Sequence, residues 1–214
     1  MHIEPGTISP VKAMAANAAA SGVFMYYARF LIKNPVLLIK GLLAAVFFSV
    51  FMQAYHMPVG ASELHFLGAT AIYLTLGFIP TLFGFMAGLL LQGLLFEQRD
   101  LIHLAVNSLS LVLPLITAHF TLGKKLFQNT EDKLSFKKVI KFDAAFYAGV
   151  TTMVGFWLFI GEVQTSLAAW LTFTASYIVI VAIEPFISMI LITLLKKRED
   201  SSFVQKYFEV IDAK

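Results

Sequence analysis

The sequence of 214 residues contains no cysteine and few charged residues. Without cysteine it can form no disulfide, no thiolate metal site and no cysteine nucleophile. Charged residues make up 14% of the chain, against about a quarter in globular proteins. Apolar residues make up 58%, and the mean hydropathy is +0.79. These features predict an all-α, polytopic membrane helix bundle.

Several catalytic signatures are also missing. The chain has no GxxxxGK[ST] phosphate-binding loop, so we expect no ATPase site of its own. It contains neither HExxH nor GxSxG, the usual protease and hydrolase motifs. No stretch has the pattern of a convincing strand, so no dinucleotide-binding turn is expected. The formal net charge is only +3, and the basic residues flank apolar runs, which indicates membrane orientation. We therefore expect neither an enzyme nor a nucleic-acid-binding protein.

Apolar runs of membrane-spanning length follow one another along the chain. Gly84 and Gly88 have the spacing of a small-residue pattern that lets two helices pack closely. Residues 1–199 are predicted to form the bundle and residues 200–214 a cytoplasmic tail. About seven helices are predicted, one of them short, at Val11–Ile32, Val36–Tyr55, Leu67–Phe78, Thr81–Phe96, Ile102–Leu122, Phe142–Ile160 and Ser166–Leu195.

Lysine and arginine gather at Arg29 and Lys33, in the loop Gly123–Lys141 and after Leu195. The positive-inside rule places these regions in the cytoplasm, with the N-terminus outside and the C-terminus inside. We expect a multi-pass protein of a bacterial or archaeal inner membrane. The basic loop is expected to contact either anionic lipid or the acidic surface of a partner. The outer face then carries residues 1–10, 56–65, 97–101 and 161–165.

The first two residues, Met1 and His2, offer three nitrogen ligands in one plane. They are the α-amine, the deprotonated backbone nitrogen of His2 and the Nδ1 atom of its ring. Such planar nitrogen sites suit Ni²⁺ or Cu²⁺, and Co²⁺ in some settings. We expect this N-terminus to be retained, because residues 1–11 lack the basic start of a signal peptide and a bulky second residue protects Met1. His65 is the candidate fourth ligand, although an interfacial histidine with no metal role would look the same.

Other polar residues could surround such a site. His103, in an outer-face segment, could line the same cavity. Gln92 and Asn107 are amides on neighbouring spans, where they could orient metal ligands or join two helices by hydrogen bonds.

Glu184 is the one carboxylate that the predicted spans place well inside the membrane. An ionisable residue in that position is a functional candidate by default. It could pair with Lys40 or Arg29, carry protons or receive a partner helix, and the sequence does not choose among these.

Three stretches together resemble a known family. The start MHIEPG resembles the MHI-x-x-G start of CbiM/NikM-type proteins, the substrate-binding S components of nickel and cobalt energy-coupling-factor transporters. Residues 62–70 resemble that family's histidine loop, which precedes a glycine-rich short helix. Residues 104–107, LAVN, resemble its Leu-Gly-Ala-Asn motif. The resemblance covers roughly the first two-thirds of the chain, and Arg99-Asp100 replaces the family's Gly-Gly turn.

The resemblance implies a seven-helix subunit that captures Ni²⁺ or Co²⁺ at the outer face and has no catalytic cofactor. It implies that Met1, His2 and His65 hold the metal and that Asn107 lies near it. A transmembrane coupling subunit and cytoplasmic ATPases would be its partners. The alternative is a stand-alone secondary permease that uses Glu184 and has no N-terminal metal site. A membrane-anchored structural partner without metal is a third possibility.

Overall fold

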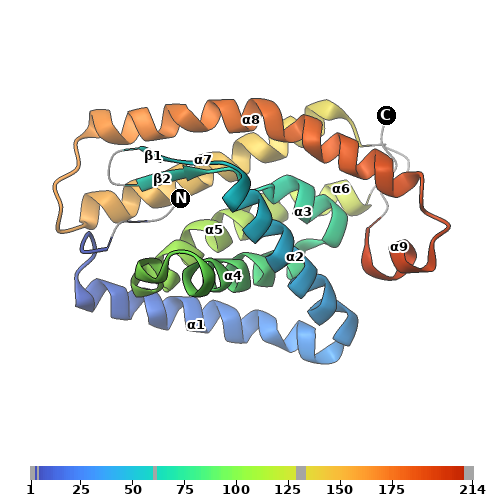
Figure 1. Cartoon of the computed structure of the whole chain (residues 1–214), viewed down its shortest axis with the longest axis horizontal. Coiled ribbons are helices and arrows are strands. Elements are labelled where there is room, and N and C mark those ends of the chain that lie inside the picture. The colour runs from blue at the N-terminus through green and yellow to red at the C-terminus, as the bar shows by residue number, and fades with distance from the viewer. Residues whose placement is uncertain (1–2, 4, 60–61, 129–133, 210–214) are drawn as a thin grey trace.

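The computed structural model describes residues 3, 5–59, 62–128 and 134–209. Long helices surround the short helix α3, which is buried along its whole length, and a two-stranded hairpin (Figure 1). The elements in chain order are α1 Pro10–Lys33, α2 Pro35–Ala54, β1 His56–Val59, β2 Ser62–His65, α3 Ala69–Leu76, α4 Phe78–Leu95, η1 Gln98–His103, α5 Leu104–Ala118, η2 His119–Gly123, α6 Lys124–Gln128, α7 Phe136–Ile160, α8 Leu167–Lys196 and α9 Ser202–Tyr207. The prediction of a polytopic helical membrane protein is confirmed.

Five helical segments within the described residues are long and apolar enough to cross a membrane. The helix α1 has 24 residues but is not among them, because it is the least apolar of the long helices. The number of spans and the orientation of the termini therefore stay predictions. The five segments are Pro35–Ala54, Phe78–Leu95, Gln98–Phe127, Phe136–Ile160 and Leu167–Lys196.

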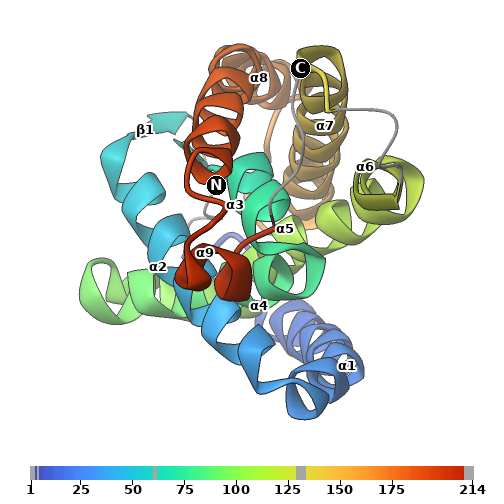
Figure 2. The same ribbon diagram turned by 90° about the vertical axis from the view of Figure 1, so that its right-hand side faces the viewer.

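The predicted close packing at Gly84 and Gly88 is confirmed. A Cβ atom on Gly84 would lie 2.3 Å from the Cβ of Ala44, and one on Gly88 would lie 2.4 Å from the ring of Phe48. Both neighbours are on α2, so the two glycines let α4 approach that helix closely. This contact forms one wall of the bundle (Figure 2).

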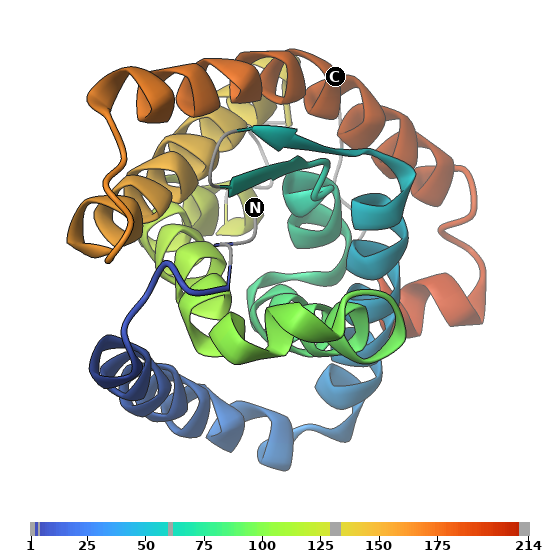
Figure 3. The same cartoon turned by 60° about the vertical axis from the view of Figure 1, so that its left-hand side comes forward.

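The hairpin corrects the expectation that the chain has no strands. Strand β1 pairs antiparallel with β2, and His56 lies opposite His65. The backbone of Ile3 forms an antiparallel bridge with Ser62, the first residue of β2. Strands of four residues show too little alternation to be recognised in a sequence. The hairpin sits between α8 and the helices α4 and α5 (Figure 3).

The basic region Gly123–Lys141, expected to be a loop, is helical at both ends of its described part. Helix α6 begins at Lys124, and α7 begins at Phe136, before its expected start. Val139 and Phe142 are buried, while Lys137 and Lys141 are exposed. The first turns of α7 are thus amphipathic. The many lysines in this region led to the expectation of a loop.

The described part of the C-terminal tail packs against the bundle near the end of α3 (Figure 2). The backbone N–H of Glu209 donates to the carbonyl of Thr75 at 2.7 Å. The ammonium of Lys40, which is buried, lies 2.6 Å from the Glu209 carboxylate. Lys40 therefore pairs with the tail and not with Glu184. The boundary between bundle and tail at residue 199 stays a prediction.

Candidate metal-capture site

The segment that carries the predicted metal ligands is anchored at Ile3. This side chain is fully buried, and its backbone N–H donates to Oδ1 of Asn107 at 3.0 Å. The same residue forms the bridge to Ser62 in β2. The structure thus brings the N-terminal segment, the hairpin and α5 together at one place. Met1 and His2, the predicted chelating residues, lie outside the described residues.

A second set of contacts holds the chain just before and at the start of α1. The backbone N–H of Glu162, in the loop between α7 and α8, donates to the carbonyl of Thr7 at 2.7 Å. The Lys12 ammonium lies 2.7 Å from the Glu162 carboxylate. The hydrogen bond and the charge of Lys12 lower the pKa of Glu162. This ion pair therefore forms above that pKa and is lost as the pH falls through it.

His65, the predicted fourth ligand, ends strand β2 and is 5% exposed. Its Nε2 atom lies 2.9 Å from the Glu63 carboxylate. Its ring stacks on that of His56, with centroids 5.8 Å apart. A carboxylate on one ring nitrogen fixes the tautomer and orientation of a metal-binding histidine. Glu63 was not among the predicted site residues. Residues 63 and 65 lie on the same side of a strand, so the formation of β2 is what brings the Glu63 carboxylate to the His65 ring.

Asn107 contacts the anchored segment from α5, and His103 precedes it at the end of η1. Asn107 is 1% exposed, and its carbonyl oxygen accepts the hydrogen bond from Ile3. His103 is buried at the end of η1, four residues before Asn107 in the chain. The roles of both residues towards metal stay predictions.

Gln92 makes its contacts between two helices. Its amide nitrogen donates to the Ser49 carbonyl at 2.7 Å, and its carbonyl oxygen accepts from Gln53 at 2.7 Å. Both partners are on α2. Gln92 thus joins α4 to α2 by hydrogen bonds, which is one of the two roles that the sequence left open for it.

Glu184 is fully buried and binds the start of α3. It accepts the backbone N–H of Thr70 at 2.7 Å and the hydroxyl of Tyr147. Of the roles that the sequence left open for Glu184, pairing with Lys40 is not formed, because Lys40 pairs with Glu209. Because α3 follows β2 after a short connection, Glu184 holds the helix that supports the hairpin.

A second carboxylate, Asp143 on α7, corrects the expectation that Glu184 is alone inside the bundle. Asp143 is fully buried and accepts a hydrogen bond from the Thr70 hydroxyl. Thr70 therefore connects both carboxylates, one through its side chain and one through its backbone. The early start of α7 explains the oversight: the expected span began at Phe142, which left Asp143 at its edge.

Gly68 turns the chain from the hairpin into α3. Its backbone is left-handed, with a φ of +61°, and a Cβ atom there would lie 2.1 Å from the ring of Phe51. Only glycine adopts this conformation without strain, and only glycine leaves room for the ring. The position of His65 relative to α3 thus depends on this residue.

Gly68→Ala is expected to lower stability by at least about 1–2 kcal/mol, because an L-residue is strained in the left-handed conformation and its methyl group would meet Phe51. Thermal unfolding of the detergent-solubilised protein measures the change. Gly22→Ala is the matched control, because a Cβ at Gly22 meets nothing within 4 Å and alanine favours a helix. Equal melting temperatures for the two variants would show that the turn does not need glycine.

Comparison with known proteins identifies the family. A family model for the cobalt uptake substrate-specific transmembrane region, CbiM, matches residues 2–201. The chain belongs to the CbiM family. A crystal structure described as a transition metal transporter has the same fold as this CbiM-family chain, with a TM-score of 0.72, 19% sequence identity and 97% of each chain covered. The search of curated proteins found no match. The CbiM-family chain is thus a multi-pass membrane component of metal uptake.

Proposed function

We propose that this CbiM-family protein captures Ni²⁺ or Co²⁺ through an N-terminal nitrogen chelate completed by His65. The observation that carries the proposal is the anchoring of Ile3, one residue after His2, to both β2 and Asn107. The bridge brings Ile3, the residue that follows His2, onto strand β2, which ends at His65. Within the described residues no three His, Cys, Asp or Glu side chains converge on a metal position. The proposed site accordingly draws its remaining ligands from Met1 and His2.

The proposed ligands would be the α-amine, the backbone nitrogen and ring of His2, and the ring of His65. All four are nitrogens, and a planar set favours Ni²⁺ and Cu²⁺ over ions that need octahedral oxygen ligands. The metal is the cargo, so it must be bound reversibly. The amine, the amide and the imidazoles bind only after losing protons, and binding should therefore weaken as the pH falls. Glu63 would hold the His65 ring in place.

Transport would need other subunits. The sequence contains no phosphate-binding loop. We infer that a transmembrane coupling subunit and cytoplasmic ATPases, as in an energy-coupling-factor transporter, drive release of the metal into the cell. The membrane would then be the inner membrane of a bacterium or archaeon, with the N-terminus outside.

Calorimetric titration with Ni²⁺ and Co²⁺ tests the capture function. The protein must be purified in detergent with an unmodified N-terminus, without a preceding tag or residue. One tight site for either ion is expected. The absence of heat and of bound metal for both ions would contradict the proposal.

Glu184→Gln separates metal capture from the permease alternative. Its amide oxygen can still accept the Thr70 N–H, so we expect nickel or cobalt affinity within about threefold of the native value. Glu184→Leu removes the acceptor and leaves that buried N–H unpaired, so it should destabilise the protein by about 1–3 kcal/mol. Metal uptake into cells and calorimetry on the purified variants measure both effects. Uptake abolished by Glu184→Gln with binding intact would favour a proton-coupled role for this carboxylate.

A further inference from the structure

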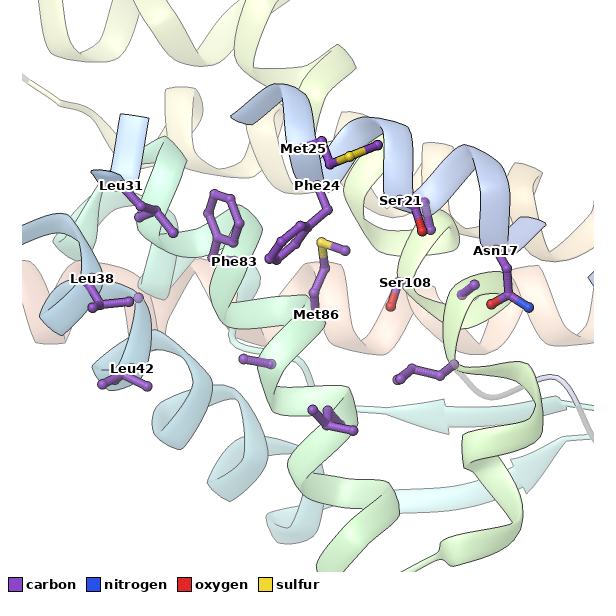
Figure 4. Close-up of a pocket in the computed structure, with 16 residues that line it drawn as sticks. Asn17, Ser21, Phe24, Met25, Leu31, Leu38, Leu42, Phe83, Met86 and Ser108 are labelled. Atoms are coloured by element: carbon purple, nitrogen blue, oxygen red, sulfur yellow. The ribbon is translucent and has the colours of Figure 1, made fainter. Parts of the chain in front are cut away.

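An apolar groove lies between part of α1 and the neighbouring helices. Its volume is about 620 Å³, and it lies between α1 on one side and α2, α4 and α5 on the other (Figure 4). Polar side chains occur towards one end, at Asn17, Ser21 and Ser108. Most of the lining is hydrocarbon, and it includes Phe24, Met25, Leu38, Leu42, Phe83 and Met86.

The dimensions of the groove fit one extended hydrocarbon chain. Along α1 it reaches from Asn17 to Leu31, which is about 21 Å at 1.5 Å per residue. The hydrocarbon layer of one leaflet is about 15 Å thick, half of the bilayer core.

The groove is displaced towards the basic end of α1. Leu31 lies two residues from the last residue of the helix, Lys33, whereas Asn17 lies seven residues after its first residue, Pro10. Arg29 and Lys33 are both exposed at this end. Within residues 3, 5–59, 62–128 and 134–209, neither forms an ion pair with a carboxylate. Their charges are therefore available to a phosphate at the membrane surface.

We propose that the groove holds one acyl chain of an anionic glycerophospholipid whose phosphate lies at Arg29 and Lys33. The lipid comes from the leaflet on the basic side of the membrane. The acyl chain fills the space between α1 and the other three helices, so α1 packs against the bundle partly through lipid. This site is distinct from the proposed metal site, and either proposal can fail without the other.

Native mass spectrometry of the delipidated full-length protein tests the proposal. The probes are palmitoyl-oleoyl phosphatidylglycerol and phosphatidylcholine, which share their acyl chains and differ in charge. We expect one retained phosphatidylglycerol, preferred over phosphatidylcholine by at least about fivefold, as expected from one or two basic residues at the membrane surface. The double variant Arg29→Gln/Lys33→Gln should bind both lipids equally.

Variants with larger side chains test the position of the acyl chain. Ala87 and Ala105 line the groove, so Ala87→Phe/Ala105→Phe should reduce lipid retention at least about tenfold by occupying its volume. Ala19→Phe is the matched control, because Ala19 is exposed on α1 and outside the groove. The single variants Ala87→Phe and Ala105→Phe serve if the double variant does not fold.

Three results would overturn the proposal. Equal retention by the groove-filling and control variants would place the lipid elsewhere. Loss of all bound phosphatidylglycerol on delipidation, with none regained on titration, would show that the native groove holds no lipid. Equal retention of the two lipids by the native protein would overturn the role of Arg29 and Lys33.

Discussion

Three glycines added ahead of Met1 are expected to weaken Ni²⁺ and Co²⁺ binding by more than about a hundredfold. The added residues convert the α-amine of Met1 into an amide and move the free amine too far from His2 to share a planar chelate with its ring. The five-membered chelate ring between the amine and the His2 backbone nitrogen is then lost. The loss should exceed the 10–100-fold that is typical for residues that only support metal ligands. Calorimetry on the extended and native proteins measures it.

The control for this prediction is three glycines added after Lys214, which change the length equally at the other end of the chain. Its affinity should equal that of the native protein. His2→Ala should match the N-terminal extension, because it removes the ring nitrogen of the same chelate. Native affinity in both N-terminal variants would show that Met1 and His2 do not bind the metal.

Asn107→Leu is expected to weaken metal binding by about 10–100-fold without removing any proposed ligand. The leucine cannot accept the Ile3 N–H, and that buried group would be left unpaired. The segment that carries His2 would then lose its contact with α5. A smaller fall in melting temperature should accompany the loss of affinity.

Asn107→Asp is the matched variant, because it has the same shape and keeps an oxygen for the Ile3 N–H. It should retain affinity within about tenfold of the native protein. If Asn107→Leu also retained native affinity for nickel and cobalt, the contact between Ile3 and α5 would have no part in metal capture.

Hydropathy predicted most of the helices well. The expected spans Val36–Tyr55 and Ser166–Leu195 differ by only one residue at each end from α2 and α8. A run of about 20 apolar residues is a strong signal, because every backbone group in a lipid-exposed segment must be paired within a helix. Asn107 lies beside the N-terminal segment, and its predicted place near the metal stays a prediction.

The connections between helices were harder to predict, because their structure depends on distant residues. Strand β2 pairs with Ile3, which lies 59 positions before Ser62 in the sequence. Neither segment alone has the alternation of a strand. Asp143 was missed for a similar reason: nearby lysines suggested a loop, and only the packing of α7 against α3 shows that this carboxylate is buried.

X-ray absorption spectroscopy of the nickel-loaded protein, beside its His65→Ala variant, tests the proposed metal site most directly. A planar shell of four nitrogens is expected, with the scattering pattern of two imidazole rings. His65→Ala should lose one imidazole and gain an oxygen from water. A six-coordinate shell dominated by oxygen, or identical spectra for the two proteins, would contradict capture by the N-terminal chelate and His65.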